Sequence, residues 1–403
     1  MNGFDSGIHA RRRALFMEQL GAAAAVIPAA ALATHHADCE WPFRQDSDFF
    51  YLTGFDEPDA VALLLPHRPE GERYVLFVQP KDPAAEVWTG FRWGTEGAVE
   101  RYGADLAHPL DQLSEKLPEY LAGAEAIAFR VGRNTSVESM VLSAWGRQLD
   151  TYARTGTAAL GLVAPTPILH RLRLRKEPHE LERLREACRI SSEAHELARS
   201  ITRPGMNEAE VQAAMEAHFR SNGARGPAYG SIVAGGDNAC VLHYTANTAP
   251  LLYSLVLEAQ EAAVAVVAPG GTAEAVHDTA LRILVEGLVD LGLLIGDVDG
   301  IIERGDYRHL YMHRTGHWLG LDVHDVGAYR LGEQPAPLEP GMVLTVEPGL
   351  YVSDRLSVPE GQPEIDDRWK GIGIRIEDDV AVTETGHEVL TAGALKSVAA
   401  MER

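Results

Sequence analysis

Residues 371–379, with the sequence GIGIRIEDD, constrain the fold more than any other short segment of the chain. Three isoleucines recur at every second position, which is the side-chain period of a β-strand and not that of a helix. The opposite face of this strand carries glycines together with Arg375 and Glu377. Because a strand with one wholly apolar face is held in register by a hydrophobic core, the segment predicts a sheet whose other face is polar.

A second strand of the same kind is predicted at residues 341–349, GMVLTVEPG. Met342, Leu344 and Val346 form its apolar face, and Thr345 and Glu347 lie on the opposite face. The Pro-Gly pair at 348–349 ends the strand. Two interpretations of the polar faces are open. They are either solvated surfaces with an Arg375–Glu377 ion pair, or walls of a cleft whose carboxylates bind a metal ion.

The segment MHRTGHWLGLDVHD (312–325) contains three histidines, His313, His317 and His324. Two glycines within it disfavour a continuous helix, so we expect a loop that leads into a strand at 319–324. Three histidines beside glycines favour a binding site, although a single histidine would more often be a packed residue. With His317 as a nitrogen ligand, the carboxylates would suit Mn, Zn, Co or Fe better than Ca.

The N-terminal part of the chain alternates between short apolar runs and helix-like stretches. The runs are VALLLP (61–66), RYVLFVQP (73–80) and AIAFRVG (126–132), and such alternation is typical of an α/β domain. A segment rich in proline and arginine, PTPILHRLRLRKEPHE (165–180), follows. We therefore predict one domain at 1–170 and a second at 171–403.

Three arginines at 11–13 precede an apolar run, as in a twin-arginine export signal. Glu18 and Gln19 interrupt that run, so we expect instead a helix that stops at Gly21 and a buried strand after it. The formal net charge of −22 disfavours nucleic acid and anionic membranes as partners. The three cysteines are too few for a disulfide framework, which favours a cytoplasmic location.

The second domain contains a weak internal repeat, PGMNEAEV (204–211) and PGGTAEAV (269–276). In each copy a residue that commonly caps helices, Asn207 or Thr272, precedes a glutamate and a valine, which is typical of the start of a helix. The match is short, so a chance similarity and a duplication are both open.

Together these segments closely resemble the Xaa-Pro aminopeptidases (aminopeptidase P), of the metallopeptidase family whose pita-bread fold is shared with prolidase, methionine aminopeptidase and creatinase. The matching segments, in family order, are WPFRQDSDFFYLTGFDEPDA, VLHYT, HRTGHWLGLDVHDVG, LEPGMVLTVEPGLY and GIGIRIEDD. The resemblance implies an N-terminal α/β domain and an α+β pita-bread catalytic domain with two pseudo-symmetric halves. It also implies removal of an N-terminal residue that precedes proline, at a site with two Mn²⁺ ions.

The resemblance also implies roles for individual residues. His317, Glu347 and Glu377 match metal ligands, and Glu347 matches the general base as well. His243 and His324 match histidines that position the substrate and stabilise the developing oxyanion.

Three further residues have counterparts near the family's active site. His313 matches another active-site histidine, and Arg375 matches an arginine of the cleft. Trp88 lies where the family can reach the site of a neighbouring subunit, and the resemblance implies a homodimer or a homotetramer.

Two further ligands of the family, both aspartates on adjacent strands after the HYT segment, are missing from this chain. Here HYTANTAPL (243–251) runs directly into LYSLVLEAQEAA (252–263), which resembles the helix that follows both strands, and no acidic residue lies between Asp237 and Glu258. We therefore predict an internal deletion after Pro250 that removes two central strands of the catalytic sheet. One metal ion or none is then expected in place of two, with Zn²⁺ or Co²⁺ as alternatives to Mn²⁺.

Three interpretations of the deletion are open: a shortened form of an active enzyme, an enzyme with an impaired site, and an inactive homologue that binds peptides or has a structural role. Prolidase is the nearest alternative among enzymes. Because a lost strand leaves backbone groups of its neighbours unpaired, a swapped or added strand would favour a dimer.

Overall fold

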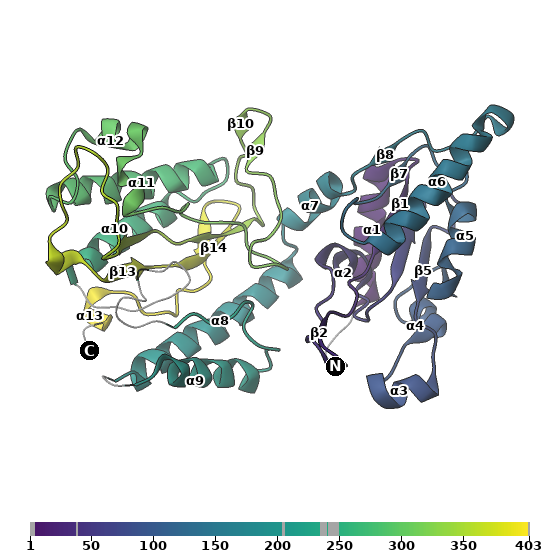
Figure 1. Cartoon of the computed structure of the whole chain (residues 1–403), viewed down its shortest axis with the longest axis horizontal. Helices are drawn as coiled ribbons and strands as arrows, with labels where there is room; N and C mark the ends of the chain where they lie inside the picture. The colour runs from purple at the N-terminus through teal and green to yellow at the C-terminus, as the bar shows by residue number, and fades with distance from the viewer. Residues whose placement is uncertain (1–4, 38, 204–205, 234–239, 241–249, 402–403) are drawn as a thin grey trace. The chain divides into compact units, whose positions relative to one another are not determined.

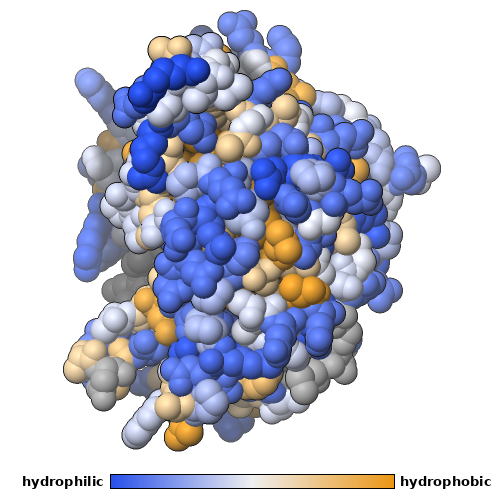
Figure 2. Space-filling model, turned by 90° about the vertical axis from the view of Figure 1, so that its right-hand side faces the viewer, coloured by the Kyte–Doolittle hydropathy of each residue, from blue (hydrophilic) through white to orange (hydrophobic). Residues whose placement is uncertain are grey.

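The computed structural model describes residues 5–37, 39–203, 206–233, 240 and 250–401 (Figure 1). It divides into two compact units, Met1–Arg173 and Leu174–Arg403. Figure 2 shows one face of the chain, on which hydrophilic residues predominate and hydrophobic residues form small separate groups. Within the described residues, no helix combines the length and the apolar character that crossing a membrane requires.

The first unit is built on a mixed six-stranded sheet with the order β6-β5-β4-β1-β7-β8. Its strands are β1 (Ala24–Pro28), β4 (Val61–Leu64), β5 (Tyr74–Val78), β6 (Leu106–Pro109), β7 (Ile127–Ala128) and β8 (Leu162–Val163), with a separate hairpin of β2 (Thr34–His36) and β3 (Cys39–Glu40). Its helices are α1 (Ser6–Leu20), α2 (Ser47–Thr53), α3 (Pro83–Thr89), α4 (Gly94–Glu100), α5 (Leu113–Tyr120), α6 (Thr135–Thr155) and α7 (Thr166–Leu174), the last of which ends in the second unit.

The N-terminal segment folds as predicted, with α1 ending before Gly21 and β1 buried behind it. Gly21 has a φ of 67°, which favours glycine and turns the chain from the helix into the sheet. Two of the three arginines are packing residues, since Arg12 lies 4.1 Å above the Tyr51 ring and Arg13 lies 3.8 Å above the Tyr74 ring. The predicted strands at 61–66, 73–80 and 126–132 are confirmed as β4, β5 and β7.

The second unit combines two helix pairs with antiparallel strands. Its helices are α8 (Pro178–Ile201), α9 (Glu208–Ser221), α10 (Pro250–Ala265), α11 (Ala273–Asp290), α12 (Val298–Arg304) and α13 (Val398–Met401). Its strands are β9 (Arg330–Leu331), β10 (Gln334–Pro335), β11 (Val343–Val346), β12 (Gly349–Val352), β13 (Ile372–Arg375), β14 (Asp378–Val382) and β15 (His387–Val389).

Helix α8 packs against α9, and α10 packs against α11. Both predicted caps are confirmed: Asn207 accepts from the backbone N–H of Ala209 at 2.9 Å, and Thr272 accepts from that of Ala275 at 3.0 Å. The same cap chemistry thus begins the second helix of each packed pair.

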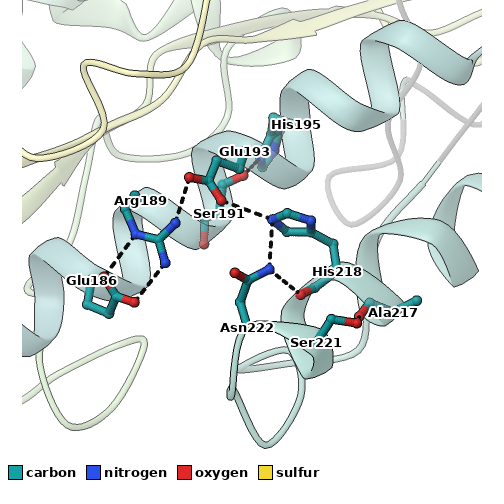
Figure 3. Close-up of polar contacts among 9 residues, drawn as sticks. All are labelled: Glu186, Arg189, Ser191, Glu193, His195, Ala217, His218, Ser221 and Asn222. Carbon is teal, nitrogen blue, oxygen red and sulfur yellow. Dashed lines mark hydrogen bonds and ion pairs between the residues drawn. The ribbon is translucent and has the colours of Figure 1, made fainter.

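Exposed polar side chains connect α8 and α9 (Figure 3). His218 of α9 contacts the Glu193 carboxylate of α8 at 3.3 Å, and Arg189 pairs with both Glu186 and Glu193 along α8. Such exposed pairs contribute little individually, so this network supports the helix pair without forming a buried site.

Strand β11 pairs antiparallel with β14, and β12 pairs antiparallel with β13. The two pairings continue one register. Val346 lies opposite Asp378 in one pairing, and Gly349 lies opposite Arg375 in the other. The shared register places Glu347 and Glu377 opposite each other, at the break between the two pairings. The apolar faces of all these strands pack with α10 and α11 in one core, so the predicted alternation in 341–349 and 371–379 is confirmed.

Candidate metal centre

Three predicted ligands converge at the break between the strand pairs. His317, Glu347 and Glu377 each offer one ligand atom, and these atoms lie within 4.8 Å of one another. The His317 Nε2 and Glu347 Oε1 atoms are 3.4 Å apart. One imidazole and two carboxylates form a donor set that holds catalytic divalent metals in other proteins.

The loop that carries His317 lies directly against β11. The backbone N–H of Thr345 donates to the His317 carbonyl at 2.9 Å, and the N–H of Leu319 donates to the Val343 carbonyl at 3.0 Å. Gly316 permits this approach, because a Cβ there would lie 1.9 Å from the Thr345 carbonyl oxygen. The His317 Nδ1 contacts its neighbour's carbonyl, that of Trp318, at 3.0 Å. An Nδ1–H that donates there leaves the Nε2 lone pair directed toward Glu347.

The predicted strand at 319–324 is wrong, because the segment that runs beside β11 is 315–319 and the chain then turns. The Asp325 N–H donates to the Trp318 carbonyl at 2.9 Å and closes a loop. The Asp325 carboxylate lies against Gly320, where a Cβ would be 2.0 Å from Oδ2. The buried Lys176 ammonium contacts that carboxylate at 3.1 Å. The loop therefore replaces the strand because a buried ion pair holds its base.

Glu347 is held from two sides. The Thr345 hydroxyl donates to Oε1 at 3.3 Å, and the Arg375 Nε lies 3.5 Å from Oε2. Burial raises the pKa of the Glu347 carboxyl above its usual range, and the positive charge of Arg375 partly offsets this effect. The carboxylate is thus positioned, and its affinity for a proton is increased.

Glu377 has an exposed side chain but lies among other acidic groups. Surrounding protein atoms raise the pKa of its carboxyl above the usual range, and repulsion from Glu347 and Asp379 adds to the shift. Crowded carboxylates of this kind are stabilised by a cation placed between them.

Arg375, Tyr351 and His313 form a connected group beside Glu347. The Arg375 Nε donates to the Tyr351 hydroxyl at 2.9 Å, and the His313 Nε2 lies 2.9 Å from the same hydroxyl. Burial raises the pKa of Tyr351 to about 12 and lowers that of His313. Gly349 leaves room for this group, since a Cβ there would lie 2.6 Å from the Tyr351 hydroxyl.

The remaining predicted residues differ in how the structure places them. The His324 ring packs edge-on against His317 with 4.3 Å between ring centroids, so His324 lies at the centre. His243 lies outside the described residues. Trp88 is 88% exposed on α3, in the first unit.

The N-terminal domain of aminopeptidase P matches residues 9–128, and metallopeptidase family M24 matches 182–252 and 249–384. The chain belongs to the aminopeptidase P family of metallopeptidases. The predicted resemblance is therefore confirmed, and so is the fold class, an N-terminal domain followed by a pita-bread catalytic domain.

Relatives of this family cover nearly the whole chain. The Xaa-Pro aminopeptidase of Escherichia coli K12 is 38% identical over 423 residues, covering 96% of this chain and 94% of that protein. Aminopeptidase PepP of Pseudomonas aeruginosa aligns with a TM-score of 0.92 and 40% identity, covering 100% of this chain and 98% of that one. A zinc-substituted E. coli aminopeptidase P in complex with product aligns at 0.91 and 37% identity, covering 100% and 98%.

Two features of these matches bear on the predicted deletion. The alignment with the E. coli protein spans 423 positions but covers only 96% of this 403-residue chain, so part of that protein has no counterpart here. The two parts of the M24 match meet at residues 249–252. Among residues 222–233 and 240, which the structure describes between α9 and α10, there is no strand. The loss of two central strands remains a prediction.

Tyr351 and Tyr229 were not predicted from the sequence, and Thr345 was placed beside Glu347 on the polar face without a role. Tyr351 lies four residues after Glu347, so the strand alternation places it on the same face and could have identified it. Tyr229 lies close enough for the charges of Glu377 and Arg375 to act on its hydroxyl, and no sequence pattern marks it.

Proposed function

We propose that this chain is a metal-dependent aminopeptidase that removes the N-terminal residue of peptides with proline in the second position. The observation that carries the proposal is the convergence of His317, Glu347 and Glu377 within 4.8 Å in a member of the aminopeptidase P family. The relatives named above are all Xaa-Pro aminopeptidases or aminopeptidases P, and they cover both domains. They favour neither a prolidase nor an inactive homologue.

The residues present fit one divalent metal ion. His317 supplies an imidazole nitrogen and the two glutamates supply oxygens, and three protein ligands are sufficient for many catalytic metals. Desolvation by surrounding protein atoms raises the pKa of both carboxyls, and repulsion from Glu347 adds to the shift at Glu377, which favours a cation between the two groups. We propose Mn²⁺, with Zn²⁺ or Co²⁺ as substitutes, and one ion per chain, because the two aspartates of the family are missing.

A bound metal ion would acidify the attacking water and polarise the scissile carbonyl. Glu347 is the general base that takes a proton from that water, and Thr345 and Arg375 hold its carboxylate in place. His324 donates to the oxyanion that develops on the carbonyl, a role that His243 shares. Hydrogen bonds through Tyr351 connect His313 to Arg375, and Arg375 forms an ion pair with the base, so the histidine and Glu347 are linked.

The free amino terminus of a peptide is a cation, and the acidic cluster around Glu347 and Glu377 would attract it. We propose that Trp88, exposed on α3, contacts the substrate site of a neighbouring copy in a homodimer or homotetramer, and that the protein is cytoplasmic. The negative net charge makes nucleic acid an unsuitable partner.

The proposal is tested with the purified chain loaded with Mn²⁺. We expect cleavage of a tripeptide with proline second, no cleavage of its alanine counterpart, and about one Mn²⁺ per chain by elemental analysis. Glu347→Gln should lower kcat by at least ~100-fold, whereas Glu388→Gln, which removes a surface carboxylate paired with Arg185, should not. Cleavage of Xaa-Pro dipeptides alone would indicate a prolidase, and no cleavage with no bound metal would favour the inactive homologue.

A further inference from the structure

A buried polar group lies beneath the loop that joins His313 to His317. It consists of His277 on α11 together with Thr315 and Tyr311, which are 7%, 1% and 1% exposed. The Thr315 hydroxyl lies 2.8 Å from His277 Nδ1 and 2.6 Å from the Tyr311 hydroxyl. None of these three residues belongs to the proposed metal centre or to its predicted substrate contacts.

The hydrogen bonds define the state of the histidine ring. The backbone N–H of Thr315 donates to His277 Nδ1 at 3.2 Å, so this nitrogen carries the lone pair and the ring proton lies on Nε2. The Thr315 hydroxyl can then donate to the same nitrogen while accepting from Tyr311. Burial lowers the pKa of His277 to about 4, and the nearby positive charges of Arg314 and His313 add to this, so the ring is neutral at neutral pH.

Thr315 is held by all of its polar atoms. Besides the contacts of its N–H and its hydroxyl, its carbonyl accepts from the backbone N–H of Glu347 at 2.7 Å. Thr315 lies midway between His313 and His317 and is also bonded to the strand end that carries Glu347. The position of Thr315 therefore affects two predicted ligands, His317 two residues later in the loop and Glu347 at the end of the neighbouring strand.

We propose that His277 is a positioning residue of the peptidase site, which fixes Thr315 and thereby the loop from His313 to His317 against Glu347. This inference rests on the proposed function for its consequence, but the contact it describes can be tested without a metal. A purely apolar core position would be served equally well by leucine. A positioning role requires a hydrogen-bond acceptor at the place of Nδ1, and the side-chain oxygen of asparagine can supply one there.

The test compares His277→Leu, which removes the acceptor, with His277→Asn, which retains one. Hydrogen exchange of peptides that cover residues 311–319 should be at least ~10-fold faster in H277L than in wild type, and close to the wild-type rate in H277N. Urea midpoints of each variant distinguish local unfolding of this loop from a loss of global stability. The affinity for Mn²⁺ alone should fall ~10–100-fold in H277L and recover in H277N, as for other groups that orient metal ligands. Equal exchange in H277L and wild type, or an H277N that behaves as H277L, would overturn the proposal.

Two outcomes separate this inference from the proposed function. If the wild-type chain binds no Mn²⁺, the proposed metal centre is wrong, and the exchange data still decide the role of His277. If H277L does not fold, Tyr311→Phe removes only the hydroxyl that contacts Thr315 and should accelerate exchange in the same peptides to a smaller extent. Unchanged exchange in Y311F would then count against the network.

Discussion

The buried ion pair between Lys176 and Asp325 gives the sharpest test of how the histidine loop is held. Their side chains are 3% and 1% exposed, and the Lys176 Nζ lies 3.1 Å from Asp325 Oδ2 and 3.2 Å from the Leu174 carbonyl. The backbone N–H of Lys176 also donates to the Gly341 carbonyl at 2.8 Å. The lysine thus connects the start of the second unit to the loop that carries His317 and His324.

Lys176→Met should destabilise the second unit by about 3–5 kcal/mol, because Asp325 then keeps a buried charge without its ammonium partner. Asp325→Leu should cost a similar amount for the same reason. The double variant K176M/D325L should cost far less than the two single changes together, since an apolar pair of similar volume needs no compensating charge. Lys370→Met removes a lysine from an exposed pair with Asp367 and serves as the control, for which no measurable change is expected.

Urea unfolding followed by pulsed hydrogen exchange reports the two units separately, which matters because a chain with two units need not unfold in one step. Peptides from residues 174–403 give the free energy of the second unit. Single variants that each cost under about 1 kcal/mol, or a double variant whose cost equals the sum of the two, would refute the claim that this pair is electrostatically coupled and holds the loop.

Three further outcomes are expected. Because the pKa of His277 is about 4 in the folded chain and 6.5 is its ordinary value, the unfolded chain binds more protons between pH 4 and 6.5. The free energy of unfolding should therefore fall by up to about 3 kcal/mol as the pH drops through this window. Urea midpoints at each pH would show this loss, which should be smaller in H277N. Gly316→Ala should destabilise by about 1–3 kcal/mol, because its Cβ meets the Thr345 carbonyl, whereas Gly386→Ala has open space and should not, as thermal unfolding would show. Tyr351→Phe should lower kcat by roughly 10-fold and lower stability by about 1–2 kcal/mol, because Arg375 and His313 lose their shared partner. Unaltered steady-state kinetics would exclude this role for the hydroxyl.

The local elements of this fold could be predicted from the sequence because their signals are short-range. Alternation of apolar residues identified β11 and β13, and the caps at Asn207 and Thr272 identified the starts of α9 and α11. The strand expected at 319–324 failed for the opposite reason. Its apolar residues suggested a continuous strand, but the contact of Asp325 with Lys176, 149 residues earlier in the chain, turns the segment into a loop.

The residues of the candidate site could likewise be predicted from the sequence only where their signals are local. Glu347 and Glu377 were recognised by type and by resemblance, but their opposition follows from the shared register of β11–β14 and β12–β13, which neither strand reveals alone. Tyr351 could have been found from its spacing to Glu347. His277 could not, because a histidine on a largely apolar helix has no partner in its own sequence neighbourhood.

The hydrogen bonds that support the three predicted ligands lie outside the predicted deletion. His317 is held by backbone hydrogen bonds to β11, and Glu347 and Glu377 are held by the strand pairs that flank them, so every one of these bonds joins residues within 315–319 and 343–382. None of them requires the segment around Pro250. The backbone bonds that hold the three proposed ligands therefore do not run through the strands predicted to be missing. We propose that this set binds one metal ion, whereas a second ion would need oxygen donors beyond it. The number of metal ions bound per chain, one or two, therefore tests the predicted deletion more directly than the rate of peptide cleavage does.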